Sequence, residues 1–223
     1  MGYHIGLMEE KTKKKLIKFF KKYPLTKYRK GGIILEPGEE FPGIIFVKSG
    51  YVRVYTLFKN KKQVTLQMFR PTLYFSLIGA ITKQVNHHYF EAITPAELWV
   101  APMKETLEYV EKDKELKDDL MKTILSELVE MSVSMGEYIT GNARNKVAGI
   151  IKYLGERFGK TKRDKVWIKF KVSHKLVASL TGLTRETVTL QMLKLKKEKI
   201  IETKKRQMVI RDEEKLKEAS EGK

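Results

Sequence analysis

The sequence predicts an α+β protein: a β-rich N-terminal domain, a long helix, and a smaller C-terminal domain that mixes helices with short strands. Three observations support this fold class. Apolar residues recur with a period of two between residues 31 and 101, and with a helical period between residues 104 and 140. Beyond residue 141, short helical and strand-like segments alternate. We therefore expect three parts, at residues 1–115, 116–140 and 141–223.

The first part begins with a short amphipathic segment. Between residues 9 and 23, apolar side chains that include Leu16, Phe19 and Phe20 lie on a lysine-rich background, and Pro24 ends the run. The pattern predicts a helix whose lysines form its solvent-exposed face.

The segments that follow are typical of strands. They are short β-branched and aromatic runs separated by Pro-Gly, Ser-Gly and Lys-Asn-Lys corners. In one of them, Val52 and Val54 alternate with Arg53 and Tyr55, which predicts a strand with one solvent-exposed face. The segments together predict an all-β domain, a roll or a small barrel, that ends near Pro102.

The long helix carries two apolar ridges. The first comprises Leu116, Leu120, Ile124, Leu128, Met131, Met135 and Tyr138, and the second Met121, Leu125, Val129 and Ile139. So wide an apolar surface is hard to bury against one compact β-domain, and pairing with a second copy of the chain would cover it. The alternative is a helix that packs across its own β-domain.

Composition excludes several classes of function. The chain has no cysteine, which removes disulfides, thiolate catalysis, cysteine-ligated zinc and iron–sulfur clusters. The apolar runs are far shorter than the roughly 20 residues that a bilayer requires, and the N-terminus lacks the apolar region of a signal peptide. We expect a soluble, cytoplasmic protein without a cofactor or a membrane partner.

The positive charge is concentrated in the last part of the chain. From residue 141 onward there are 23 Lys and Arg against 10 Asp and Glu, an excess of 13 out of the total net charge of +18. Such asymmetry is typical of modules that bind polyanions, because each neutralised phosphate releases counterions. A lysine-rich proteome, with the charge simply solvated, is the alternative.

Residues 173–202 contain two helical patterns joined by a glycine. Ser173 stands at a cap position, and Leu176, Val177 and Leu180 give the first helix an apolar face. Gly182 suits a left-handed turn, and Thr184 caps a second helix. The inward side chains of that second helix are expected to be Val188, Met192, Leu193 and Leu195.

A strand precedes this pair of helices and a hairpin follows it. Residues 166–172 alternate as a strand does, and residues 203–212 predict a small hairpin with a basic tip before a charged tail that frays. Two helices around a tight glycine turn, followed by a basic hairpin, form a winged helix-turn-helix pattern. Its usual partner is double-stranded DNA.

The start of the second helix carries the residues that would contact bases. In this geometry the first turn enters the major groove, so Arg185 can donate to guanine and Glu186 can accept from cytosine, while Thr184 and Thr187 hold phosphates. The remaining candidate DNA contacts are Ser173, His174, Gln191, Lys204, Lys205 and Arg206. The alternatives are an ordinary helical hairpin with a solvated Arg and Glu, and a non-specific architectural protein that binds through lysines.

Nearly the whole chain resembles the Crp/Fnr family of bacterial transcription regulators. Residues 38–55 look like the family's cyclic-nucleotide-binding β-roll signature, the long helix is similar to its dimerisation helix, and residues 172–201 resemble its helix-turn-helix. The TRETV core at residues 184–188 is the most specific match. The resemblance implies a homodimer on a pseudo-palindromic operator with half-sites about 34 Å apart, acting as activator or repressor, with RNA polymerase as a further candidate partner.

Two departures from the family pattern stand out. Leu190 occupies a position where well-known members carry another base-contacting arginine. A leucine could only contact a thymine methyl group or pack against the protein. The operator should therefore differ in sequence from the operator of those members. Cyclic-AMP-binding members carry a Gly-Glu pair and, about ten residues later, an Arg-Ser or Arg-Thr pair. Here Phe75 and Ser76, then Asn86 and His87, occupy those positions, and without the cation a buried cyclic phosphate is strongly disfavoured.

The effector, if the roll binds one, should therefore be a small apolar or aromatic molecule. The candidate pocket residues are Tyr74, Phe75, Ser76, His87, Tyr89, Met131 and Ser132. A filled core without any ligand is the alternative. A haem sensor and a cupin-like metal enzyme both fit this sequence poorly. Each needs histidines that converge on one site, whereas the adjacent His87 and His88 would point to opposite faces of a strand.

Overall fold

The computed structural model describes residues 8–77, 82 and 84–222, with the backbone only at residues 127 and 130–140. The chain divides into two compact units. The first runs to Leu57 and resumes at Leu66–Ser132, and the second comprises Phe58–Thr65 and Val133–Lys223. Each unit is described by itself below.

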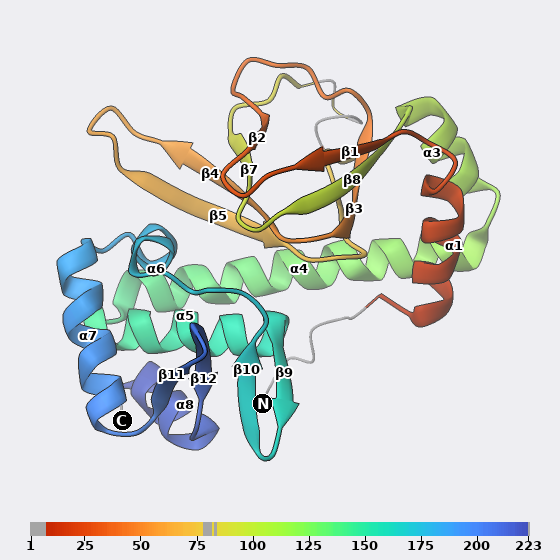
Figure 1. The fold of residues 1–223 in the computed structure, drawn as a ribbon. Helices are drawn as coiled ribbons and strands as arrows, with labels where there is room; N and C mark the ends of the chain where they lie inside the picture. Colours follow the sequence, from red (N-terminus) through yellow and green to blue (C-terminus); the bar gives the residue numbers. More distant parts are fainter. Residues whose placement is uncertain (1–7, 78–81, 83, 223) are drawn as a thin grey trace. The chain divides into compact units, whose positions relative to one another are not determined.

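The first unit is built on two antiparallel four-stranded sheets (Figure 1). One sheet has the order β1-β8-β3-β6, formed by Leu25–Tyr28, Ala96–Ala101, Ile44–Ser49 and Tyr74–Phe75. The other has the order β2-β7-β4-β5, formed by Ile33–Leu35, Tyr89–Ala92, Val52–Leu57 and Gln63–Phe69. Strands that are neighbours in a sheet are therefore often distant in sequence, as in a β-roll.

The prediction that one face of β4 (Val52–Leu57) is solvent-exposed is wrong. Val52 and Val54 are buried as expected, but Arg53 is only 5 % exposed and Tyr55 is also buried. Arg53 lies opposite Glu91 of β7 and donates to its Oε2 from Nε at 3.1 Å and from Nη2 at 2.6 Å. Its guanidinium also lies 4.3 Å from the ring centroid of Tyr55. The cation is buried because a carboxylate and an aromatic face on its own sheet compensate it.

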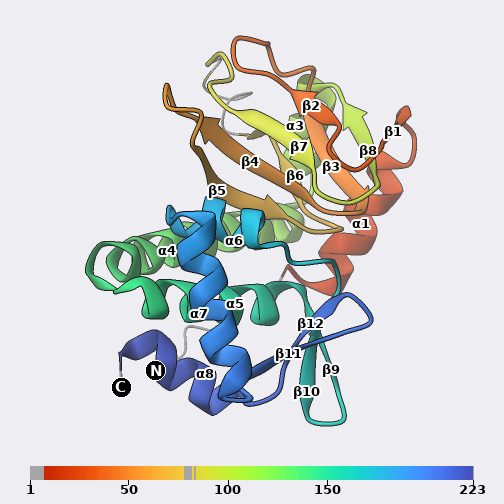
Figure 2. The same cartoon turned by 60° about the vertical axis from the view of Figure 1, so that its left-hand side comes forward.

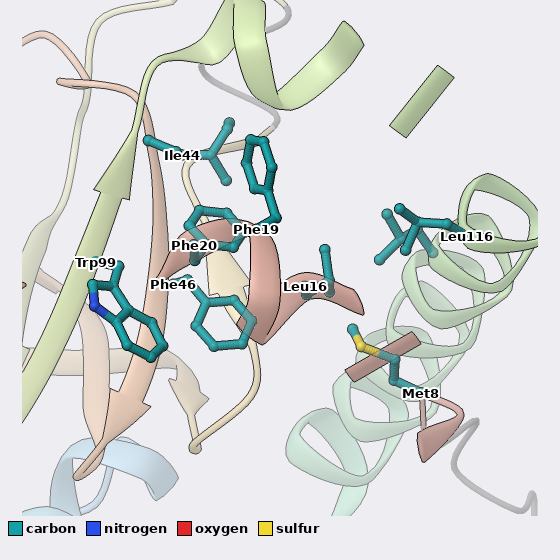
Figure 3. Close-up of a cluster of buried hydrophobic side chains, with 10 residues drawn as sticks. Met8, Leu16, Phe19, Phe20, Ile44, Phe46, Trp99 and Leu116 are labelled. Carbon is teal, nitrogen blue, oxygen red and sulfur yellow. The ribbon is translucent and has the colours of Figure 1, made fainter. Parts of the chain in front are cut away.

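Among the described residues, the helices of the first unit include α1 (Glu10–Phe20), α3 (Met103–Glu111) and most of α4 (Lys114–Thr140), which belongs to this unit as far as Ser132. The apolar spacing predicted for α1 places Leu16, Phe19 and Phe20 in the core. Figure 3 shows them in one cluster that also contains Met8, Ile44, Phe46, Trp99 and Leu116. This cluster joins helix α1 to strands β3 and β8 and to the first turn of α4.

Both apolar ridges of α4 include exposed side chains, and burial is confined mainly to the start of the helix, with Ile124 half-buried. Leu116 and Leu120 are buried in the first unit's own core. Met121, Leu125, Leu128 and Val129 are 45–61 % exposed. The side chains from Met131 to Thr140, which include the rest of both ridges, lie outside the described residues. In its described part, the helix therefore packs on its own domain mainly at its beginning.

The described part of the second unit contains the end of α4, four complete helices and a four-stranded sheet of order β11-β12-β10-β9. The helices are α5 (Ala143–Phe158), α6 (His174–Thr181), α7 (Arg185–Lys197) and α8 (Glu213–Glu221). The strands are β9 (Gly159–Lys162), β10 (Lys165–Ile168), β11 (Ile201–Lys204) and β12 (Gln207–Ile210).

Two sequence predictions for this unit need correction. The strand predicted at 166–172 is β10, which ends earlier, at Ile168. The charged segment before it contains most of β9, and the two strands form a hairpin. The charged tail does not fray at residues 213–221 but forms α8. Asp212 caps α8, Leu216 and Ala219 are buried, and Asn145 of α5 donates to the carbonyl oxygen of Ala219 at 2.9 Å.

Candidate nucleic-acid interface

Helices α6 and α7 begin at hydroxyl caps and meet at a glycine, as the sequence predicts. The Ser173 hydroxyl accepts from the backbone N–H of Leu176 at 3.1 Å, and the Thr184 hydroxyl accepts from that of Thr187 at 3.2 Å. Gly182 ends α6 with φ 69° and ψ 4°, the left-handed conformation that glycine adopts without steric cost. The turn between the helices is therefore fixed by local chemistry at both ends.

The buried side of α7 is formed by Val188, Met192 and Leu195, each at most 2 % exposed. Leu193, expected on this side, is 55 % exposed, so that prediction is wrong. The buried residues follow a spacing of four and three, and Leu193 lies about 100° of helix rotation from Met192. Leu193 instead shares a side with Glu186 and Leu190, at spacings of four and three.

The exposed side of α7 carries the predicted base-contacting residues. Arg185 and Glu186 are both exposed and occupy the first turn. Leu190 is 59 % exposed one turn later. An exposed arginine, a carboxylate and two leucines therefore stand on a helix whose opposite side is anchored in the core; α7 and its neighbour α6 are seen from the front in Figure 2.

A polar contact joins α6 to the exposed half of α7. His174 Nδ1 lies 2.8 Å from Thr189 Oγ1, and the Thr189 hydroxyl is 2.8 Å from the carbonyl oxygen of Arg185. Burial lowers the pKa of His174 from its ordinary value of 6.5, and the nearby charges of Lys196 and Arg185 lower it further. The neutral imidazole is therefore favoured near neutral pH. Thr189 was not among the predicted site residues, although its spacing of four from Arg185 places it on the same helix side.

The hairpin β11–β12 supplies the predicted basic tip. Lys204 pairs with Gln207 across the hairpin, so Lys205 and Arg206 form a two-residue loop, and both have positive φ, 48° and 64°. Both side chains are exposed. Lys204 differs, because its Nζ lies 3.2 Å from Oε1 of Glu202. The loop therefore presents two cations, Lys205 and Arg206. The charge of the third predicted cation, Lys204, is partly neutralised by Glu202 on the same strand.

The remaining predicted DNA contacts lie on the same two helices. Ser173 and Thr184 are exposed, whereas His174, Thr187 and Gln191 are half-buried. The Thr184 and Thr187 hydroxyls are 2.9 Å apart, so they contact one another at the start of α7. Backbone N–H groups at this helix start carry the partial positive charge that attracts phosphate.

Comparison with known proteins identifies the two units. A model of the Crp-like helix-turn-helix domain matches residues 145–219, and a model of the cyclic nucleotide-binding domain matches residues 25–113. The chain belongs to the Crp/Fnr family of transcription regulators. The predicted fold class is confirmed, with a β-sheet cyclic-nucleotide-binding-type domain followed by helices and a C-terminal helix-turn-helix.

Several Crp/Fnr proteins resemble the chain over most of its length. The Global nitrogen regulator of Nostoc sp. is 21 % identical over 185 residues, 82 % of this chain and 83 % of the relative. Transcriptional regulator LdrP of Thermus thermophilus is 26 % identical over 175 residues, 78 % of this chain and 86 % of the relative. The names of both relatives describe regulators.

Solved structures agree on the fold. A CRP/FNR-family transcriptional regulator from Thermus thermophilus has a TM-score of 0.69 at 25 % identity, covering 89 % of this chain and 98 % of that one. A CooA structure from Carboxydothermus hydrogenoformans has a TM-score of 0.75 at 20 % identity, covering 97 % and 99 %. No helix in the described part of this Crp/Fnr chain is long and apolar enough to cross a membrane.

The predicted effector-pocket residues whose side chains are described have different surroundings. Phe75 is packed inside the roll, and its ring stacks on that of Phe90 with 4.9 Å between the ring centroids. Tyr74 packs instead against the cluster on the α1 side. Tyr89 stacks on Tyr55 at 5.1 Å, and His87 is exposed. Two further predicted residues, Met131 and Ser132, have side chains outside the described residues.

At the positions aligned with the nucleotide-binding pairs, side chains form hydrogen bonds to the protein backbone instead. The buried Ser76 hydroxyl donates to the carbonyl oxygen of Gly43 at 2.6 Å. Asn86 is 2 % exposed, and its Nδ2 donates to the carbonyl oxygens of Glu36 at 2.7 Å and His88 at 2.6 Å, while its Oδ1 accepts from the His88 N–H. The side chain of Asn86 thus fixes two loops to one another. No local sequence pattern indicates this role.

Among the described residues, no group of three or more His, Asp or Glu side chains could hold a metal ion. His88, the neighbour of His87, instead has its Nδ1 2.9 Å from the Thr56 hydroxyl.

Proposed function

We propose that this Crp/Fnr-family protein is a sequence-specific DNA-binding regulator that acts as a homodimer on a pseudo-palindromic operator. One observation carries the proposal: Arg185 and Glu186 are exposed on the first turn of α7, which Thr184 caps and a buried apolar side anchors. An arginine fork can donate to guanine O6 and N7, and a carboxylate can accept from the cytosine amino group.

The rest of the second unit supports the contact with the duplex. The two exposed cations of the β11–β12 loop, Lys205 and Arg206, suit the phosphate backbone. Ser173, Thr184 and Thr187 lie at helix starts, where hydroxyls and N–H groups can bind phosphates. Such contacts give register and affinity, and the base contacts of α7 give specificity.

The homodimer is supported by α4. Met121, Leu125, Leu128 and Val129 are exposed along about two and a half turns of one helix. A self-complementary apolar helix surface of this kind is buried most economically by a twofold-related copy. A dimer of this kind would bind two half-sites about one DNA turn apart, ~34 Å. RNA polymerase is the further partner that the family implies.

The roll is proposed to sense no cyclic AMP. Phe75 and Ser76 fill the core and bind backbone, Asn86 is committed to loop carbonyls, and Arg53 is paired with Glu91. A buried cyclic phosphate needs a cation and donors that these residues do not offer. Titration of the purified protein with cyclic AMP should give no saturable binding and no change in DNA affinity.

The test of DNA recognition is selection of bound sequences from random DNA with the purified protein alone. We expect enrichment of a pseudo-palindrome. Arg185→Ala should abolish the preference among sites while general affinity for DNA falls much less. Arg163→Ala, at the exposed tip of the β9–β10 hairpin, is the matched control and should leave the preference intact. If Arg185→Ala weakens all DNA sequences equally, the protein is a non-specific binder.

A further inference from the structure

The first unit contains a partly open cavity of about 200 Å³ on the α1 side of its β-sheets. Its walls come from α1, α3, α4, β3 and β6. Leu16 and Phe20 of α1 and Ile44 of β3 form the inner wall and are at most 2 % exposed; Figure 3 shows these three side chains. Val110 of α3, which is half-buried, and Met121 of α4, which is 52 % exposed, also line the cavity.

The cavity lining is mostly apolar, and three of its polar residues, Thr106, Lys117 and Glu111, have partners. The Thr106 hydroxyl donates to the carbonyl oxygen of Pro102 at 2.9 Å. At the rim, Lys117 Nζ lies 2.8 Å from both carboxylate oxygens of Glu111, so the two charges neutralise each other. An ionic ligand would lose its hydration here without gaining an unpaired counter-charge from these residues. The lining therefore selects for an uncharged guest.

The size of the cavity sets the size of the guest. An apolar cavity of ~150 Å³ in a protein stays dry and binds benzene or xenon. A cavity of about 200 Å³ has room for a ring with one or two small substituents. Larger polycyclic molecules would have to displace Leu16 or Phe20 from the core.

This cavity is separate from the interior of the roll. Phe75 and Phe90 belong to the cluster between the sheets, and Asn86 lies among the loops that it binds. Of the residues predicted for an effector, only Tyr74 is among the described side chains that line the cavity. The cavity therefore marks a second place at which the unit can take a small molecule.

We propose that this cavity binds a small uncharged apolar molecule of the size of toluene or a simple phenyl derivative. The bound molecule contacts Leu120, Met121 and Ile124, all on α4. Because Met121 also belongs to the exposed surface of α4, the guest touches the helix that carries the proposed dimer contact; this last step rests on the proposed function.

The test uses the full-length protein and toluene as the probe. Toluene should bind saturably, as measured by calorimetry or by ligand-observed NMR, and benzoate, which has a similar ring and a charge, should bind at least tenfold more weakly. Val110→Phe places a ring in the cavity and should weaken toluene binding at least tenfold. Met121→Trp, at an exposed position of the rim, should do the same and keeps the test valid if Val110→Phe is unstable.

The matched control is Ile17→Phe, an aliphatic-to-phenyl change on α1 at a position 36 % exposed and outside the cavity lining. It should bind toluene as the wild type does. The proposal is overturned if the wild type shows no saturable toluene binding, if benzoate binds equally well, or if both cavity variants retain wild-type affinity. None of these readouts uses DNA, so a failure of operator selection would leave this result unchanged, and the reverse also holds.

Discussion

The Nδ1 atom of His174, the first residue of α6, lies 2.8 Å from Oγ1 of Thr189 in α7. The Thr189 hydroxyl has a single proton, which it donates to the carbonyl oxygen of Arg185. It must therefore accept from His174, which places the imidazole proton on Nδ1. This pair of hydrogen bonds ties the start of α6 to the turn of α7 that carries Arg185 and Glu186.

Thr189→Val should loosen that connection without changing the shape of the side chain. Loss of the hydroxyl leaves the His174 donor without its acceptor, so we expect the free energy of unfolding to fall by about 1 kcal/mol in denaturant titrations. The preference for the selected operator over random DNA should fall severalfold in anisotropy measurements. Thr203→Val, at an exposed position of β11, is the control and should change neither quantity. Unchanged operator preference in Thr189→Val would show that the connection does not position α7.

Stability should depend on the protonation of His174. Its pKa in the folded protein is lowered below 6.5, mainly by burial, so the unfolded chain takes up a proton first as the pH falls. The stability that the neutral imidazole contributes is therefore complete above about pH 6.5 and is lost as the pH falls towards the folded-state pKa.

We expect the free energy of unfolding to decrease between pH 7 and 5, and to decrease less in His174→Asn, whose amide can still donate to Thr189 but does not titrate. Burial and the neighbouring His87 lower the pKa of His88 in the same direction, so part of the decrease remains in this variant. His88→Asn measured in parallel separates the two contributions. An identical pH profile for wild type and His174→Asn would contradict the assignment.

Leu190 should make its operator position sensitive to a single methyl group. In the selected operator, replacing the thymine that faces Leu190 with uracil removes only the C5-methyl. At about 0.8 kcal/mol for a buried group of that size, wild-type affinity should fall about fourfold. Leu190→Ala should bind the thymine and uracil sites equally. Leu193→Ala serves as a comparison, because Leu193 is also exposed but one turn further from the helix start.

The exposed surface of α4 should be required for dimerisation. Leu128, 61 % exposed in the single chain, would be desolvated in a dimer, so Leu128→Glu should give a monomer in sedimentation velocity experiments and weaken operator binding at least a hundredfold. Leu57→Glu, at a position 44 % exposed on β4, is the control and should remain a dimer. A dimeric Leu128→Glu protein would place the interface elsewhere.

The features that the sequence predicts correctly are mostly local chemistry. The caps Ser173 and Thr184 and the left-handed Gly182 follow from a few neighbouring residues, and all three are confirmed. The prediction for Leu193 is wrong because it rests on apolar character rather than on helical phase; the spacing of Val188, Met192 and Leu195 already contains the correct side of the helix.

Features that depend on distant partners are out of reach of local patterns. The burial of Arg53 depends on Glu91, which is 38 positions away and becomes a neighbour only when β4 and β7 pair. The folding of the C-terminal segment into helix α8 depends on its contact with Asn145 of α5. Alternation of polar and apolar residues describes the two sides of a strand, but it does not say which polar side chain has a buried partner.

The pairing of Arg53 with Glu91 has a consequence for protein engineering. A designer who wished to give this roll a cyclic-nucleotide response would find its buried guanidinium already bound to a carboxylate and stacked near Tyr55. Releasing it would leave Glu91 as an unpaired, half-buried charge, and replacing Asn86 would detach two loops from one another. A new cation would have to be introduced together with substitutes for both contacts, so no single substitution should convert the roll into a nucleotide receptor.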